Sequence, residues 1–464
     1  MLTSSRTRLR HTCAVRLRRF SASKSNGEPP RNPTAMLIFH RHGDRSPLRG
    51  HTPDEELALP IAARCKANTG AVGVGGATAS SEGVAATAAK TAEEFWRRQL
   101  VPEEDVQRLD ELYPVRRSAG EGAPPDEESA PFGCLTSVGL QQLRERGDRF
   151  RREYFADGIM DTSRVRVFST NYRRTQLSAQ GFLDGLLGGK GEGGVPVVVR
   201  PRAEDFLNQW ESRGHEMYER MMVIESGAAF RETEEIVGGP LKRQLHALDP
   251  ELFPLPQGGR FRWMMAADYF MSARARGLGV APELDALGTS TIRHLVWRFG
   301  RFYRDKEMMR TMVGPLLAHI LEGAAGSKAV TPESDSSVLS GTGSEGRPLS
   351  RVVSSSCHDV SILALLYAME AHLIEDEDYW PPYGCTIAFS VFTGRMGLGP
   401  VALASHEGYE EEEEEQERGD GIVLEICVDG APLRSRLFWN HEGKLGAVSL
   451  ADFRNAVQHL LPPP

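Results

Sequence analysis

The chain has 464 residues, of which 40% are hydrophobic and 25% charged, so it can form one large domain or two ordinary ones around a substantial core. This composition is typical of a soluble globular protein and disfavours a disordered, fibrous or membrane-spanning chain, and no window approaches the ~18 uncharged apolar residues of a transmembrane segment. The formal net charge of −8 argues against nucleic-acid binding, which requires a basic face.

The six cysteines are scattered and form no Cys-x-x-Cys pair, so we expect neither a disulfide scaffold nor a structural zinc site.

Residues 1–27 contain six arginines, one lysine and no acid. Such a composition is typical of an organellar transit peptide. The run Arg18–Ala22 resembles a mitochondrial processing site, so we expect import into the mitochondrial matrix and cleavage after Phe20. The alternatives are a basic tail, another organelle or the cytoplasm.

Residues 33–202 alternate between short apolar runs and helical patterns. Helices are predicted after Ser137 and after Ser169, because apolar side chains recur there at intervals of three and four residues. The Gly-rich and Pro-rich residues 67–90 and 117–131 are predicted to be loops. Brief apolar runs bounded by turn residues predict three strands: Ala35–His40, Val165–Ser169 and Pro196–Val199.

Residues 203–323 show mainly helical patterns, and the clearest helix spans about residues 309–321. The Gly/Ser-rich residues 324–349 predict a flexible insertion. The run Glu410–Glu415 repels itself and is predicted to be a solvated loop. Strand patterns return after residue 350 at four places: Val352–Ser354, Cys385–Phe392, Ile422–Val428 and Arg436–Trp439.

This order of elements predicts an α/β protein. Residues 33–202 and 350–464 form the α/β core, and residues 203–323 form an inserted helical cap with a connecting helix. We therefore expect any ligand at the carboxyl edge of the core strands, where ligands of open α/β sheets collect.

The segment Arg41-His42-Gly43-Asp44-Arg45-Ser46-Pro47 follows the first predicted strand and places an imidazole between two guanidiniums. Guanidinium groups match the oxygens of a phosphate monoester. An imidazole can attack phosphorus once the charges of those oxygens are held. Gly43 is predicted to allow a tight turn, and the alternative for the whole segment is an exposed basic turn.

Two further polar segments follow predicted strands: Ser169–Thr175, which contains Arg173 and Arg174, and Cys357-His358-Asp359. Taken alone, these arginines could lie on the surface, and the His-Asp pair could cap a helix. Taken together, the three segments predict a positive pocket at one sheet edge of an acidic protein. Such a pocket favours an anionic substrate, phosphate in particular.

The three segments resemble the histidine acid phosphatase branch of the histidine phosphatase superfamily. Gly133–Gln141 and Ser169–Ala179 are also similar to it, so the resemblance covers about residues 35–200 and 310–395. It implies a phosphoglycerate mutase-like mixed sheet flanked by helices, with an inserted, mainly helical cap. Two other stretches are most similar to lysophosphatidic acid phosphatases within that branch: Val313–Leu321 and Trp380–Tyr383.

The resemblance implies that His42 is the nucleophile and becomes a phosphohistidine, and that Asp359 protonates the leaving alkoxide. It also assigns the phosphoryl oxygens to four cationic side chains: Arg41, Arg45, Arg174 and His358.

His42 must be neutral to attack, whereas His358 would act best when charged. The pKa of Asp359 should be raised in the occupied site, because this carboxyl must carry a proton when the leaving group departs. We expect no metal and no other cofactor. The arginines supply the charge, and they would repel a cation held by His40, His42 and His358.

The expected partner is therefore a small-molecule phosphomonoester, first of all lysophosphatidic acid or a related lysophospholipid. A sugar phosphate and an inositol phosphate are the alternatives, and a non-catalytic phosphate-binding protein is the alternative from another class. Met and aromatic side chains of the cap either line a groove for an acyl chain or form the core of the cap. These are Trp210, Met217, Tyr218, Met221, Met222, Trp263, Met264, Met265, Tyr269 and Phe270.

Overall fold

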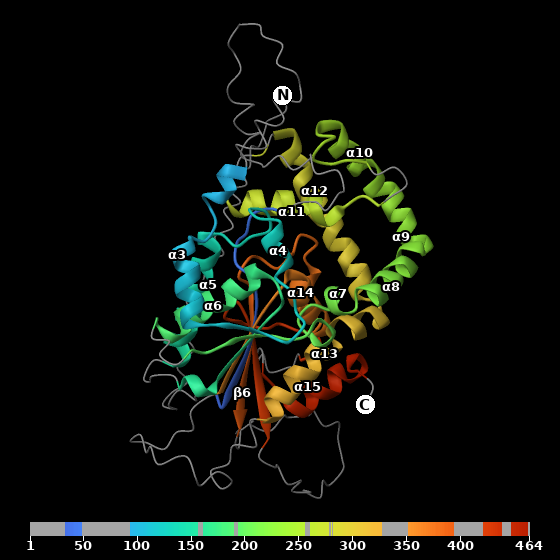
Figure 1. The fold of residues 1–464 in the computed structure, drawn as a ribbon. Coiled ribbons are helices and arrows are strands. Elements are labelled where there is room, and N and C mark those ends of the chain that lie inside the picture. The colour runs from blue at the N-terminus through green and yellow to red at the C-terminus, as the bar shows by residue number, and fades with distance from the viewer. Residues whose placement is uncertain are drawn as a thin grey trace, which may run out of the picture. The chain divides into compact units, whose positions relative to one another are not determined.

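A mixed β-sheet lies at the centre of the computed structural model (Figure 1). The structure describes residues 33–48, 93–155, 161–189, 194–255, 260–277, 280, 282–326, 351–393, 421–438 and 447–462. The expected transit peptide 1–27 with its cleavage site at Phe20, the loop 67–90, most of the insertion 324–349 and Glu410–Glu415 lie outside these residues.

The described strands form one sheet in the order β2-β4-β3-β5-β1-β6-β7-β8, and β9 pairs with β7. The strands from β2 to β1 are parallel to one another, whereas β6 to β9 pair in antiparallel fashion. The bounds are β1 Ala35–Arg41, β2 Val115–Arg117, β3 Val165–Ser169, β4 Val197–Val199, β5 Arg351–Cys357, β6 Thr386–Thr393, β7 Ile422–Val428, β8 Ala431–Pro432 and β9 Ala447–Ser449.

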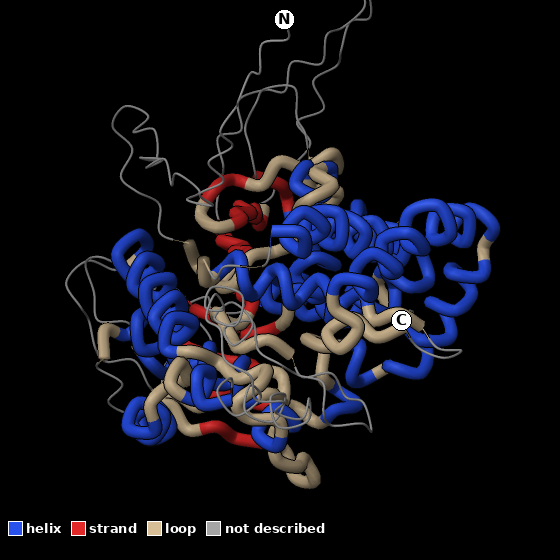
Figure 2. The backbone as a smooth tube through the Cα atoms, turned by 90° about the horizontal axis from the view of Figure 1, so that it is seen from above, coloured by secondary structure: helices blue, strands red, loops and turns tan. Residues whose placement is uncertain are grey.

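Strand β1 is buried on both faces, because its alternate side chains enter two separate cores. Met36 and Ile38 pack into the core that includes α5 (Ser137–Tyr154) and α6 (Arg173–Leu187). Leu37 and Phe39 pack into the other core, which includes residues of three helices: α13 (Lys306–Ala325), α14 (Asp359–Ala368) and α15 (Leu450–Val457). Helices therefore lie on both sides of the strands (Figure 2).

The described residues between β4 and α13 are mainly helical. Their α-helices are α7 (Gln209–Ser212), α8 (Gly214–Ser226), α9 (Ala228–Thr233), α10 (Gly239–Leu248), α11 (Trp263–Ala275) and α12 (Pro282–Tyr303), and a π-helix, η3 (Glu234–Gly238), joins α9 to α10. Two short helices of the core, α3 (Glu103–Leu112) and α4 (Pro125–Glu128), precede α5. We refer to α7–α12 as the cap.

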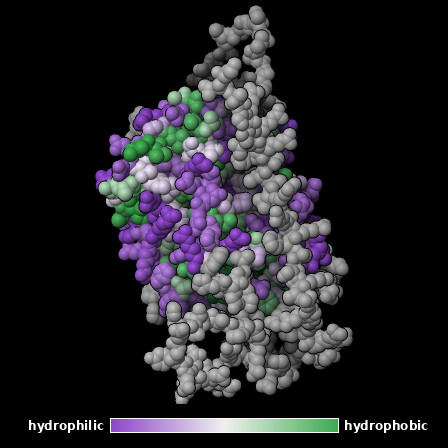
Figure 3. Space-filling view, turned by 180° about the vertical axis from the view of Figure 1, so that it is seen from behind, coloured by the Kyte–Doolittle hydropathy of each residue, from purple (hydrophilic) through white to green (hydrophobic). Residues whose placement is uncertain are grey.

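The Met and aromatic side chains of the cap divide by burial. Met217, Trp263, Tyr269 and Phe270 are buried in the hydrophobic core, which favours the interpretation as core. Other apolar side chains remain exposed, and Figure 3 shows apolar patches in the upper part of the rear view. The exposed apolar residues of α8 and η3 are Tyr218, Met222, Val223, Ile236 and Val237.

The predicted fold class, a mixed α/β sheet flanked by helices, is confirmed. The predicted strand Arg436–Trp439 is wrong, because its described residues 436–438 form a bend and a turn. The side chain of Ser435 donates a hydrogen bond to the Met369 carbonyl, and Arg436 pairs with Glu375. These contacts hold residues 435–436 outside the sheet. Helix α4 lies within a predicted loop. No helix in the described ranges is long and apolar enough to cross a bilayer.

Candidate active site

Three neighbouring parallel strands end at the same level of the sheet. Ser356 of β5 pairs with His40 of β1 on one side and with Ser169 of β3 on the other. Strand β3 ends at Ser169, and β1 and β5 end one residue later at the pair of Arg41 and Cys357, so the three chain segments leave the sheet at one edge. The structure thus brings together the segments that begin at Arg41, Thr170 and Cys357.

The ring of His42 is buried and fixed in one orientation. Its Nδ1 lies 2.9 Å from the carbonyl oxygen of Gly43, which can only accept a hydrogen bond, so Nδ1 carries the proton. The other nitrogen, Nε2, then bears the lone pair. Burial lowers the pKa of His42 well below 6.5, and Arg41 and Arg174 lower it further. The imidazole is therefore neutral at physiological pH.

The three arginines predicted to bind phosphate lie close enough to His42 to perturb its pKa. In addition, Arg41 donates through Nη1 to the carbonyl of Pro381. A carboxylate holds each of the three guanidiniums at a terminal nitrogen: Asp359 holds Arg41 (2.7 Å), Asp268 holds Arg45 (2.8 Å) and Asp126 holds Arg174 (3.2 Å).

The Nε–H groups of Arg41, Arg45 and Arg174 are buried and find no acceptor among the described residues. Buried donors nearly always have a hydrogen-bond partner, so three unmatched donors around one imidazole call for an anionic ligand. Phosphoryl oxygens would satisfy them. This arrangement can bind a phosphate group beside the lone pair of His42 Nε2.

Asp359 lies at the first position of α14, where Arg41 and the indole Nε1 of Trp380 (3.1 Å) contact its carboxylate. Burial alone would raise the pKa of Asp359, but Arg41 and Arg45 more than offset it, so the pKa is lowered. The free site therefore holds a carboxylate. A phosphate dianion between these arginines would oppose their positive field and raise the pKa of Asp359. The predicted rise in this pKa concerns that occupied site.

His358 immediately precedes α14, and its Nε2 lies 3.1 Å from the hydroxyl of Thr170. Burial and the charge of Arg174 lower the pKa of His358 well below 6.5. The ring of His358 is therefore neutral in the free site, and a charged His358 stays a prediction for the occupied site. The ring centroids of His358 and His42 are 5.7 Å apart, so a bound phosphate dianion would raise the pKa of both rings.

The segment Trp380–Tyr383 also belongs to the site. Trp380 contacts Asp359, and Pro381 accepts from Arg41. The ring of Tyr383 lies 4.2 Å from the Arg41 guanidinium and 5.8 Å from the His42 ring. A cation over an aromatic face is favourable, so Tyr383 stabilises the position of the Arg41 guanidinium.

Gly43 allows a close approach of two chain segments, and its φ is not positive. A Cβ atom at Gly43 would lie 2.3 Å from the carbonyl oxygen of Gly139, and one at Gly139 would lie 2.1 Å from that of Asp44. The two glycines let the loop after β1 pack directly on the first turn of α5. The hydroxyl of Thr136 caps α5 and also donates to Asp44, which fixes the contact.

Thr170 lies in the predicted segment Ser169–Thr175, whereas Asp126 and Asp268 are site residues that the sequence analysis missed. Both are ordinary acidic residues without a recognisable motif, and only the fold brings them to the site. Asp268 is the more remote of the two in sequence, 223 residues from Arg45, and it lies on α11 of the cap.

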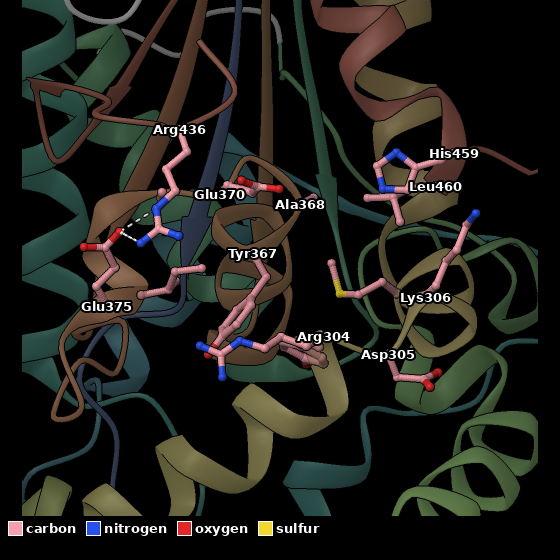
Figure 4. Close-up of a pocket in the computed structure, with 14 residues that line it drawn as sticks. Arg304, Asp305, Lys306, Tyr367, Ala368, Glu370, Glu375, Arg436, His459 and Leu460 are labelled. Carbon is pink, nitrogen blue, oxygen red and sulfur yellow. Dashed lines mark hydrogen bonds and ion pairs between the residues drawn. The ribbon is translucent and has the colours of Figure 1, made fainter. Parts of the chain in front are cut away.

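A separate cavity of about 420 Å³ lies at the opposite end of α14 (Figure 4). Its three acids, Asp305, Glu370 and Glu375, equal its Arg and Lys side chains in number, so it lacks the excess of positive charge that a phosphate site requires. These basic side chains are Arg304, Lys306 and Arg436, and His459 also lines the cavity. No group of three or more His, Cys, Asp or Glu side chains within the described ranges is arranged to hold a metal ion.

Comparisons with known proteins agree with this geometry. A sequence model of the histidine phosphatase superfamily (branch 2) matches residues 35–224. Solved structures with a similar fold include the phytase of Citrobacter braakii, which is 14% identical, covers 93% of this chain and 99% of its own, and gives a TM-score of 0.51. The phytase of Hafnia alvei in complex with myo-inositol hexakis sulphate is 13% identical, with coverages of 93% and 98% and a TM-score of 0.52. The multiple inositol polyphosphate phosphatase of Bifidobacterium longum in complex with inositol hexasulfate is 12% identical, with coverages of 94% and 94% and a TM-score of 0.54. No curated protein matches the sequence.

The α/β fold, the neutral histidine at a strand end and the surrounding arginines are the features of a phosphoric monoester hydrolase. The match to branch 2 of the histidine phosphatase superfamily covers residues 35–224, so the chain is similar to that branch over these residues.

Proposed function

We propose that the chain hydrolyses a phosphomonoester in two steps through a phosphohistidine at His42, without a metal ion. One observation carries this proposal. Nδ1 of His42 is hydrogen-bonded to the Gly43 carbonyl, which leaves the lone pair of Nε2 free to attack. Beside this ring lie three arginines whose buried Nε–H groups lack acceptors among the described residues. Phosphoryl transfer depends mainly on positioning and on neutralisation of charge. The arginines offer both, with His358 as a further donor once it is protonated.

In the first step, the lone pair of His42 Nε2 forms a bond to phosphorus as the ester P–O bond breaks. Asp359 gives its proton to the departing alkoxide. In the second step, Asp359 removes a proton from water as the water oxygen attacks phosphorus. The P–N bond then breaks, inorganic phosphate forms, and His42 and Asp359 return to their initial states.

Hydrolysis of a chromogenic aryl phosphate tests this proposal directly. We expect hydrolysis by the wild type, undiminished by a chelator, and a loss of at least about 10³-fold in His42→Ala, since a covalent route is removed. A non-catalytic phosphate-binding protein would bind inorganic phosphate but release no product. Loss of activity upon chelation, or a fully active His42→Ala variant, would contradict the mechanism.

We further propose a substrate with a single phosphate group, and lysophosphatidic acid is the first candidate. The resemblance of Val313–Leu321 and Trp380–Tyr383 to lysophosphatidic acid phosphatases supports this choice.

An inositol phosphate is the second candidate, because the solved structures with a similar fold include phytases and an inositol polyphosphate phosphatase. Initial rates at equal concentrations of lysophosphatidic acid, an inositol phosphate and a sugar phosphate separate the candidates. The fastest hydrolysis is expected for lysophosphatidic acid. A higher kcat/KM for an inositol polyphosphate would exclude the first candidate and leave the chemistry unchanged.

We also propose that residues 1–27 direct the chain into mitochondria, because they are rich in arginine and free of acids. The N-terminal sequence of the protein purified from cells tests this assignment. A new terminus after Phe20 is expected, and an intact N-terminus on a cytosolic protein would contradict it.

A further inference from the structure

One face of the cap helix α11 packs on the phosphate-binding loop. Asp268 and Ser272 lie four residues apart on α11, and Arg276 follows four residues later at its C-terminus, so all three face the same side. Asp268 holds Arg45, the hydroxyl of Ser272 lies 3.2 Å from that of Tyr383, and Arg276 pairs with Asp44 at 2.7 Å. A single helix of the cap therefore contacts both the loop after β1 and the aromatic ring beneath Arg41.

Asp268 makes the most extensive of these contacts. Its side chain is 2% exposed, and both of its oxygens are used. Oδ1 accepts from Nη2 of Arg45 at 2.8 Å, and Oδ2 accepts from Nη1 of Arg45 and from the backbone N–H of Leu48 at 2.9 Å. Nη1 of Arg45 also donates to the carbonyl of Ser46. These bonds occupy both terminal nitrogens of the guanidinium and leave its Nε–H for a ligand.

We propose that Asp268 is a positioning residue for hydrolysis: it fixes the Arg45 guanidinium so that the Nε–H edge faces the phosphoryl group, and it thereby makes the cap part of the phosphate site. This inference rests on the proposed function of the site. Asp268 acts through Arg45 and the loop, and it touches neither His42 nor the phosphoryl group.

Positioning and simple electrostatics predict opposite results for Asp268→Asn. Removing a buried negative charge beside Arg45 makes the site more positive, which by itself would strengthen phosphate binding. Loss of the paired hydrogen bonds from Asp268 lets the Arg45 guanidinium rotate, which weakens phosphate binding and slows phosphoryl transfer. The sign of the change in phosphate affinity therefore distinguishes the two effects.

Asp378→Asn is the matched control. Asp378 also forms a two-point ion pair with an arginine, Arg293, but the two side chains are 42% and 54% exposed. We expect Asp268→Asn to lower kcat/KM for an aryl phosphate by about 10- to 100-fold and to raise the inhibition constant of inorganic phosphate by about 10-fold. Asp378→Asn should stay within about twofold of the wild type for both quantities.

Two further variants address a purely structural effect of Asp268→Asn. Asp268→Glu keeps the charge but displaces the carboxylate by one methylene, so it should fold and still lose about 10-fold in kcat/KM. Ser272→Ala leaves Arg45 untouched and should cost less than Asp268→Glu.

Tighter or unchanged phosphate inhibition in Asp268→Asn and Asp268→Glu, with kcat/KM equal to that of Asp378→Asn, would overturn the inference. Full activity in His42→Ala would instead overturn the proposed function, so the two failures are distinguishable.

Discussion

The contact between Gly43 and Gly139 leads to a prediction about a residue remote from the chemistry. Gly139 lies in the first turn of α5, and a Cβ atom added there would lie 2.1 Å from the carbonyl oxygen of Asp44. Ordinary van der Waals contact begins at about 3.4 Å, so Gly139→Ala requires a displacement of about 1.3 Å. The helix is capped by Thr136 and is the stiffer partner, so the loop that carries His42 must move.

This displacement sets the expected magnitudes. Forcing an extra methyl group into a packed contact costs roughly 1–3 kcal/mol of unfolding free energy. A shift of about 1 Å in the reacting groups costs on the order of 10²-fold in rate. Gly139→Ala should therefore lower kcat/KM by about 100-fold while the protein remains folded.

The assay compares aryl phosphate hydrolysis and urea unfolding in Gly139→Ala and in Gly214→Ala. Gly214 begins α8, and a Cβ atom there would meet nothing within 4 Å, so this control should match the wild type. If Gly139→Ala were as active and as stable as Gly214→Ala, the proposed contact between the loop and α5 would be refuted.

Two further predictions concern ionisation. Burial would raise the pKa of Glu234, but His294 and Arg298 lower it from 4.5 to about 2, so Glu234 stabilises the cap above pH 4.5, by about 1–3 kcal/mol once solvent screening is allowed for. This stability is lost as the pH falls from 4.5 towards 2. Urea unfolding should show Glu234→Gln about 1–3 kcal/mol less stable at pH 7 and equal to the wild type near pH 2. The second prediction follows from the low pKa of His358 in the free site: a phosphate dianion raises this pKa, so phosphate binding should take up a proton. Calorimetry in buffers of different ionisation enthalpy should detect this uptake in the wild type, and uptake of the same size in His358→Asn would contradict the explanation.

Much of the fold follows from local patterns in the sequence. The brief apolar run Val165–Ser169 is a strand with the predicted bounds, and the strictly spaced apolar residues 309–321 lie in α13. Both are recognisable because burial imposes a period on the chain. Arg436–Trp439 has a strand-like composition but lies outside the sheet, because the contacts of Ser435 and Arg436 with remote residues decide its path.

The site was predictable to a similar extent. The segments that begin at Arg41 and Cys357 start at the last residues of β1 and β5, and parallel pairing of these strands brings them together. Asp126 and Asp268 were not predictable, because no local pattern marks an acid that will neutralise a remote arginine. The charge state of His358 was also beyond the sequence, since it depends on burial and on the placement of Arg174.

The central claim is that His42 accepts the phosphoryl group, and rapid quenching followed by mass spectrometry tests it most directly. With an aryl phosphate, whose leaving group departs without a proton from Asp359, Asp359→Asn should slow mainly the release of the phosphoryl group, so the intermediate should accumulate in this variant. We predict an acid-labile, alkali-stable phosphoryl group on the peptide that contains His42. A phosphoryl group on another residue, or steady turnover with no phosphorylated protein at any time, would contradict the account.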